Sequence, residues 1–162
     1  MELPDFPYHP DPIATGAIRP EPVLCACCGR ERPMTYVGPV YAVADLRRRL
    51  CPWCIADGSA AAKFDAQFTD AVGDLPDAVI RRTPGFSGWQ QETWLAHCGD
   101  GAAFLGEVGA REIEALPDAR ESLVEHLGDE TLLAYLVPDG AISAFLFRCR
   151  RCRAHLAYAD FS

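Results

Sequence analysis

The chain has 162 residues and a net charge of −8, with 49% hydrophobic and 23% charged residues. This length suits one domain, and this composition excludes an intrinsically disordered chain. The apolar runs fall far short of the roughly 20 residues that a membrane-spanning helix needs, and the acidic, proline-containing start lacks the apolar core of a secretory signal. We therefore expect a cytoplasmic protein without a membrane partner.

The N-terminal third combines a proline-rich segment with two cysteine pairs. Six prolines disfavour helix in residues 1–22, so this segment is expected to be an extended arm, with Phe6 and Tyr8 packed on the globule. Residues 23–43 indicate strand, tight turn and strand around Gly38-Pro39. Residues 55–68 then have helical character, with Asp57 or Ser59 as the N-cap. The pair Cys51-Pro-Trp-Cys54 is therefore expected at the entrance of a helix.

The rest of the chain is expected to mix helices and strands. Helices are predicted over residues 75–83, 111–116 and 117–127. Strands are predicted over residues 92–98 and 103–108, joined by the turn 99–101, and over a terminal hairpin of residues 142–147 and 155–161. Cys149-Arg-Arg-Cys152 lies at the tip of that hairpin.

Together these elements predict an α+β fold in one small zinc-stabilised domain, residues 1–162. Residues 1–22 form the arm, residues 23–68 form a treble-clef-like zinc module, and residues 69–162 form an acidic α/β part. The sheet of that last part is expected to be mixed or antiparallel, and a C-terminal zinc-knuckle hairpin closes it.

Four of the eight cysteines form a strong zinc signature. Cys25-x2-Cys28 and Cys51-x2-Cys54 are separated by 22 residues, a spacing typical of four-thiolate zinc sites. Two residues between cysteines let one tight turn direct both sulfurs to one ion, and a reducing cytosol keeps thiols free for metals. The first site is therefore expected to be closed and structural. Cys27 is left over.

A redox role is the competing interpretation of the second pair. Cys51-Pro-Trp-Cys54 resembles the Cys-Pro-Tyr-Cys site of glutaredoxins, so the protein could be a thiol-disulfide oxidoreductase or a redox sensor using Cys51 and Cys54. A glutaredoxin needs a strand directly before this motif, whereas Leu46-Arg-Arg-Arg-Leu50 precedes it here. The upstream cysteine pair therefore favours zinc.

The remaining cysteines predict a second zinc site. Cys149 and Cys152 form another knuckle, and Cys98 is the distant cysteine that can join them. The fourth ligand could be His97, Asp100, His155, His9 or water. Because adjacent residues of a strand face opposite ways, His97 and Cys98 can share an ion only if they lie on a turn.

An open, catalytic zinc is a weaker alternative for this site. It would use Glu92 or Asp100 as the base, but the chain has no His-Glu-x-x-His motif to support it. We leave open whether the protein is an enzyme and favour a binding role.

Charge is unevenly distributed along the chain. Residues 57–139 contain 16 acidic and 5 basic residues, whereas the remaining segments have a net charge of +3. Arginines flank cysteines at positions 47–49 and at Arg148, Arg150, Arg151 and Arg153. With a pI near 4.9, the chain as a whole repels nucleic acid, so we expect these arginines to offset the charge of metal-bound thiolates. Nucleic-acid contact at the C-terminal knuckle stays an alternative.

Distinctive blocks of residues cover nearly the whole chain and include residues 6–12, Cys25-x-Cys-Cys-Gly29, residues 51–61, residues 94–100 and residues 147–161. Together these blocks resemble the bacterial CbrC family, named after a colicin-tolerance protein. The chain departs from the family pattern at Arg153, where glycine usually follows the second cysteine, and at His155. The resemblance implies no particular reaction. The function expected is therefore zinc binding at two sites, with an unknown protein as the partner.

Overall fold

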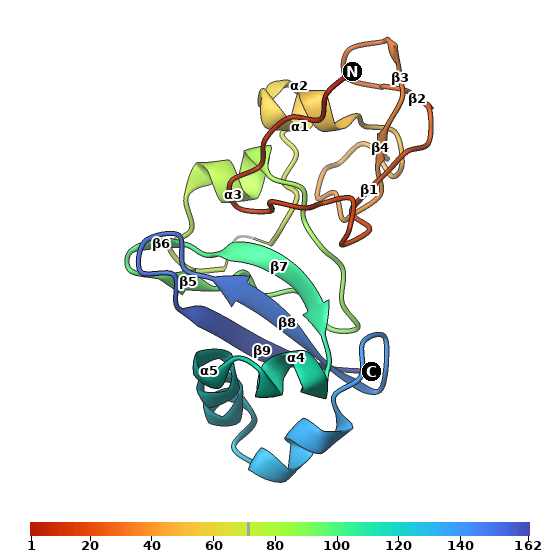
Figure 1. Ribbon diagram of the computed structural model, residues 1–162. Coiled ribbons are helices and arrows are strands. Elements are labelled where there is room, and N and C mark those ends of the chain that lie inside the picture. Colours follow the sequence, from red (N-terminus) through yellow and green to blue (C-terminus); the bar gives the residue numbers. More distant parts are fainter. Residues whose placement is uncertain (71) are drawn as a thin grey trace. The chain divides into compact units, whose positions relative to one another are not determined.

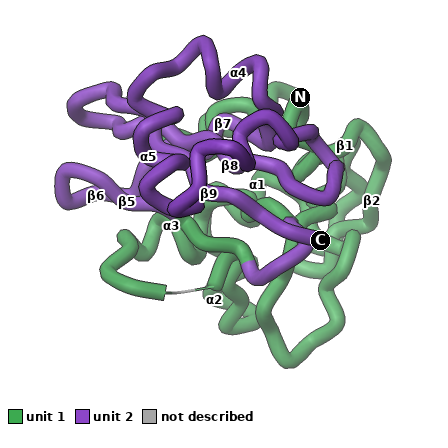
Figure 2. The backbone as a smooth tube through the Cα atoms, turned by 90° about the horizontal axis from the view of Figure 1, so that it is seen from below, with its two compact units in different colours: residues 1–87, 92–94 green, residues 88–91, 95–162 purple. Residues whose placement is uncertain are grey.

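A computed structural model of the chain describes residues 1–70 and 72–162 (Figure 1). Its backbone contacts divide into two compact units (Figure 2). Unit 1 contains residues 1–87 and 92–94, and unit 2 contains residues 88–91 and 95–162. Helices and small antiparallel sheets are both present, as the α+β prediction requires. The predicted single domain, with segments 1–22, 23–68 and 69–162, stays a prediction.

Among its described residues, unit 1 contains two small two-stranded sheets and three short helices. Strand β1 pairs with β4, and β2 pairs with β3, both antiparallel. The bounds are β1 Ile18–Arg19, β2 Val23–Leu24, β3 Glu31–Arg32, β4 Thr35–Tyr36, α1 Pro52–Ala56, α2 Ser59–Phe64 and α3 Asp77–Arg82.

The N-terminal segment packs onto this unit, as its aromatic residues led us to expect. Residues 7–17 form successive turns, and β1 follows them. Phe6 and Ile18 are buried in one cluster with Tyr36, Leu50 and Phe68. The prolines do exclude helix, but burial of the apolar side chains favours a chain that turns back onto the core.

The helix predicted over residues 55–68 is two helices. Helix α1 begins earlier, because Pro52 suits the first helical position. Gly58 then adopts a left-handed conformation with φ +81°, which ends α1 and precedes α2. The break places Ser59 at the start of α2, where it contacts the first cysteine knuckle.

Unit 2 is built on a three-stranded antiparallel sheet in the order β7-β8-β9. A register shift between Phe104 and Gly106 interrupts the pairing of β7 with β8. Further elements of this unit are a small hairpin and three helical segments. The bounds are β5 Ala96–His97, β6 Asp100–Gly101, β7 Ala103–Val108, α4 Ala110–Glu114, α5 Pro117–Leu127, η1 Glu130–Tyr135, β8 Ile142–Arg148 and β9 His155–Phe161.

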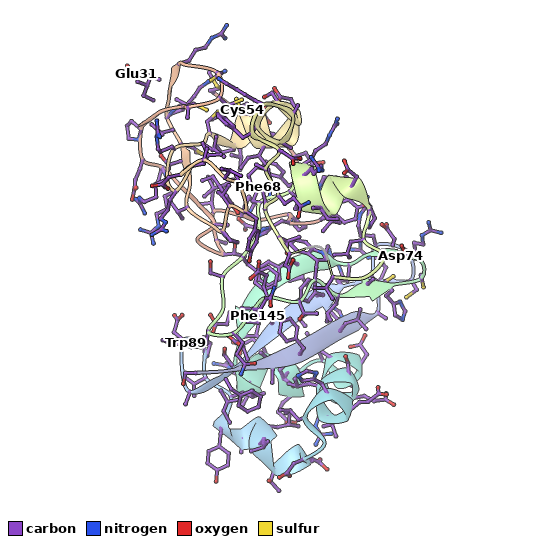
Figure 3. The ribbon with its side chains drawn as sticks, turned by 180° about the vertical axis from the view of Figure 1, so that it is seen from behind. Glu31, Cys54, Phe68, Asp74, Trp89 and Phe145 are labelled. Atoms are coloured by element: carbon purple, nitrogen blue, oxygen red, sulfur yellow. The ribbon has the colours of Figure 1, made fainter. Side chains whose placement is uncertain are left out.

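Helix α5 covers one face of this sheet (Figure 1). Its buried residues Ala119 and Leu123 belong to one apolar cluster with alternate residues of β8 and β9. Asp118 and Ser122 also accept hydrogen bonds from backbone amides of the edge strand β9. The other face carries aromatic rings, among them Phe145, which Figure 3 labels. The helix thus covers part of an edge that would otherwise be free to pair.

Two further expectations differ from the structure. The strand predicted over residues 92–98 is reduced to β5, because Glu92 and Trp94 are buried through side-chain contacts in unit 1 rather than through a strand ladder. Segment η1 was not predicted; the Asp129 side chain caps it by accepting from the Thr131 amide at 2.9 Å. Within residues 1–70 and 72–162, no helix is long and apolar enough to cross a membrane.

Candidate metal centres

The first candidate centre lies in unit 1 and consists of the four cysteines that the spacing singles out. The sulfur atoms of Cys25, Cys28, Cys51 and Cys54 all lie within 4.8 Å of one another. Cys25 Sγ and Cys54 Sγ are 3.9 Å apart. Figure 3 labels Cys54, which has other sulfur atoms near it. We call this set the first cysteine group.

Short backbone elements position these four sulfurs. Cys25 and Cys28 lie on the loop between β2 and β3, and Cys51 and Cys54 flank the start of α1. The Cys51 amide donates to Cys25 Sγ at 3.4 Å. Lys63 of α2 donates to the carbonyl oxygens of Ala26 and Cys27 at 3.1 and 3.0 Å, which fixes the loop against that helix. No signal in the sequence identifies this role of Lys63.

The second candidate centre lies in unit 2. His97 Nδ1 is 3.3 Å from Cys98 Sγ and 3.4 Å from Cys152 Sγ. With Cys149, the ligand atoms of these residues lie within 4.8 Å of one another. We call this set the second cysteine-histidine group.

A tight turn explains how adjacent residues contribute to one group. Cys98 and Gly99 form the two-residue connection between β5 and β6 and have φ values of +52° and +71°. Two successive positive φ values are typical of a type I′ hairpin turn, which normally favours Asn-Gly. This backbone turns the Cys98 side chain toward His97. The sequence had allowed these two neighbours to share an ion only at a turn, and the structure has a turn there.

The two groups contain knuckles with the same backbone hydrogen bonds. In the first, the Cys25 amide donates to the Arg30 carbonyl at 2.9 Å and the Gly29 amide donates to the Cys25 carbonyl at 2.8 Å. In the second, the equivalent bonds run from Cys149 to Ala154 at 2.8 Å and from Arg153 to Cys149 at 3.1 Å. Gly29 and Arg153 follow the second cysteine with φ +66° and +68°. Arg153 therefore occupies a position that suits glycine.

The other residues considered as a fourth ligand have different partners. His9 lies in unit 1 with its ring nitrogens 2.7 Å from the Pro84 carbonyl oxygen and from Thr15 Oγ1. His155 contacts Asp118 at 3.3 Å, and Asp100 pairs with Arg150 at 3.1 Å. Among these histidines and Asp100, His97 is the one that belongs to the second group. Cys27 lies outside the first group, with its Sγ 3.5 Å from Ser59 Oγ.

In each group, the surroundings favour deprotonation of one cysteine thiol but disfavour deprotonation of a second. Burial raises the pKa of the Cys28 thiol, but the Arg30 amide and the Arg32 side chain outweigh it and lower the pKa to about 6. Burial raises the pKa of Cys51 to about 11. In the second group, backbone amides of Cys152 and Arg151 lower the pKa of Cys149 to about 6. The neighbouring cysteines raise that of Cys98 to about 11. A divalent cation would supply the charge that several thiolates require.

The distances also suit a tetrahedral ion. Zinc–sulfur bonds of about 2.3 Å place two sulfurs of a tetrahedron about 3.8 Å apart, and a nitrogen and a sulfur about 3.6 Å apart. The Cys25–Cys54 sulfur distance of 3.9 Å and the His97 distances of 3.3 and 3.4 Å are close to these values. A sulfur–sulfur distance of 3.9 Å is far from the 2.05 Å of a disulfide, and all eight cysteines are free. Both groups could therefore hold a metal ion.

Comparisons with known proteins point to one family. The sequence model of an uncharacterised protein family, UPF0167, matches residues 3–161. UPF0167 proteins of Mycobacterium bovis and Mycobacterium tuberculosis are each 52% identical over 178 residues, covering 100% of this chain and 95% of the relative. One of Pseudomonas aeruginosa is 39% identical over 171 residues, with 94% of each chain covered. No solved structure matches the chain at a significant score.

These matches correct the family expected from the sequence. Both the family model and the curated relatives name UPF0167, and neither names CbrC. The blocks that carried the resemblance are specific to a family, but residue blocks alone do not decide which family name applies to them.

Proposed function

Because the chain belongs to the uncharacterised protein family UPF0167, we propose its function from the geometry: it binds two zinc ions and acts by binding a partner. The convergence of four ligand atoms within 4.8 Å in each unit is the observation that carries this proposal. Thiolate-rich, four-ligand sets select zinc over magnesium or calcium, which prefer oxygen.

The first ion would be a closed structural site in a treble-clef-like module. Its knuckle lies in the β2–β3 hairpin and its second cysteine pair opens α1, as that arrangement requires. Cys25, Cys51 and Cys54 are at most 3% exposed. Such burial leaves Cys51 and Cys54 poorly placed for the thiol-disulfide exchange that their motif alone suggested. Zinc there would stabilise a unit whose strands are only two residues long.

The second ion would join two distant parts of unit 2. His97 and Cys98 come from the β5–β6 turn, and Cys149 and Cys152 come from the tip of the β8–β9 hairpin. Four protein ligands would fill a tetrahedral site, so this geometry supports a structural ion more than a catalytic one. We infer that the arginines beside the knuckle serve mainly to balance thiolate charge.

Metal analysis of the purified, reduced chain tests the proposal. We expect two zinc ions per chain, and cobalt(II) in their place should give the absorption of tetrahedral thiolate sites. The variant Cys25→Ser should lose one ion and lower the stability of unit 1. The variant Cys27→Ser is the matched control, because Cys27 lies beside the first group without belonging to it. Less than one zinc per chain would refute the proposal.

A further inference from the structure

The two candidate centres differ most in how accessible their sulfurs are. In the first group, Cys25, Cys51 and Cys54 are buried. In the second, Cys98 and Cys152 are exposed, and only Cys149 is buried. Reagents in solvent can therefore reach two sulfurs of the second group directly. This inference rests on the proposed function, because it takes the second group to be a metal site.

The two exposed sulfurs lie close to each other. Both contact the same atom, His97 Nδ1, at 3.3 and 3.4 Å. Cys98 lies on the turn between β5 and β6, and Cys152 lies on the knuckle loop between β8 and β9. Turn residues move more readily than strand residues. The sulfurs could approach to the 2.05 Å of a disulfide without disrupting the three-stranded sheet.

The surroundings of these sulfurs are basic within a unit that is otherwise acidic. Arg150, Arg151 and Arg153 are exposed on the knuckle loop, and Arg150 is paired with Asp100 at 3.1 Å. Accessible thiolates in electropositive surroundings are the cysteines that oxidants modify first. Buried thiolates of a closed site are much less reactive.

We propose that Cys98 and Cys152 are an oxidation site, at which hydrogen peroxide converts the two zinc-bound thiolates into a disulfide and so releases the ion of the second group. One thiolate attacks the peroxide O–O bond, which breaks; that sulfur becomes a sulfenic acid, and the leaving hydroxide takes up a proton to give water. The second thiolate attacks the sulfenic sulfur, the S–S bond forms, and the sulfenic oxygen leaves as a second water after protonation. The two sulfurs together lose two electrons, which reduce the peroxide. An ion left with Cys149 and His97 alone has lost half of its ligands.

Titration of the zinc-loaded chain with hydrogen peroxide tests this inference. A chromogenic chelator reports the zinc released, and peptide mass spectrometry identifies the disulfide. We expect the loss of one zinc per chain, a Cys98–Cys152 link, and retention of the ion in the first group. A thiol reductant with added zinc should restore two ions per chain. Cys27→Ser should behave like the natural sequence.

Two variants and one trapping experiment keep the outcome clear. Cys98→Ser and Cys152→Ser should each lose the disulfide. If either variant no longer binds the second ion, the natural chain is instead treated with peroxide in the presence of dimedone, which traps sulfenic acid. The dimedone label should then lie on Cys98 or Cys152. Zinc lost first from the first group, a disulfide between other cysteines, or two ions that withstand peroxide would overturn the inference. A chain without zinc before peroxide is added would overturn the proposed function as well, so the two failures are distinguishable.

Discussion

Burial of His9 should make the protein sensitive to mild acid. The His9 side chain is fully buried, and both ring nitrogens have partners in unit 1. Burial lowers its pKa from 6.5 to about 4, because a charged imidazolium is poorly solvated in the core. Between these two pH values the unfolded chain binds a proton that the folded chain does not. The free energy of unfolding should therefore fall as the pH falls from 6.5 to 4.

The size of the effect follows from the two pKa values. A difference between 6.5 and about 4 corresponds to a loss of about 3 kcal/mol across this window. Below pH 4 both states carry the proton, so His9 should cause no further loss. A loss of this size is a large part of the total stability of a domain.

Urea unfolding of the natural chain and of His9→Gln, followed by tryptophan fluorescence at several pH values from 7.5 to 4, measures the effect. Glutamine keeps a donor and an acceptor but does not titrate. Loss of metal in acid affects both proteins, and His9 belongs to neither metal group, so this contribution should cancel in the difference. The stability advantage of the natural chain should shrink by about 3 kcal/mol between pH 6.5 and 4. Parallel pH curves for the two proteins would show that the burial argument is wrong.

Four further substitutions test particular backbone and side-chain contacts. Arg153→Gly should raise the free energy of unfolding by about 1 kcal/mol, because φ is +68° there. Gly29→Ala, at the equivalent position of the first knuckle, should lower the free energy of unfolding by a similar amount. Effects of the same sign for both variants in urea unfolding would contradict the comparison. Gly85→Ala should lower the free energy of unfolding by more than about 3 kcal/mol, since the added Cβ would lie 1.8 Å from the Phe68 carbonyl oxygen. A thermal melt like that of the natural chain, followed by circular dichroism, would refute this. Asp160→Asn should cost about 1 to 3 kcal/mol, because the buried carboxylate accepts from two backbone amides at 2.6 and 3.1 Å; an unchanged urea midpoint would count against it.

The first cysteine group could be predicted from the sequence because its information is local. The x2 spacing of each pair fixes a tight turn, and only two such pairs lie in the N-terminal third. Helix α5 was predicted over the residues it occupies, since Pro117 and Gly128 mark its ends. The terminal hairpin was predicted to within one residue, because apolar-rich runs lie on both sides of the knuckle.

The second group could be predicted only in part. Elimination pointed to Cys98, but the choice of His97 depended on a turn in which a cysteine takes positive φ. Backbone preferences disfavour that conformation for a residue other than glycine, so the sequence left several ligands open. The strand predicted over residues 92–98 failed for a related reason. Side-chain contacts of Glu92 with Tyr41 and of Trp94 with Phe86 determine the positions of these residues, and Tyr41 is far from Glu92 in the sequence.

The order in which the chain enters the two units limits how this gene can be recombined. Residues 88–91 belong to unit 2 and residues 92–94 to unit 1. A fragment that stops at residue 87 would lack Glu92 and with it the acceptor 2.5 Å from the Tyr41 hydroxyl. A fragment that starts at residue 95 would lack the amides that bind Asp160. A single recombination point in the gene therefore cannot transfer either unit with all of its contacts. We expect gene fusions to keep the two units together.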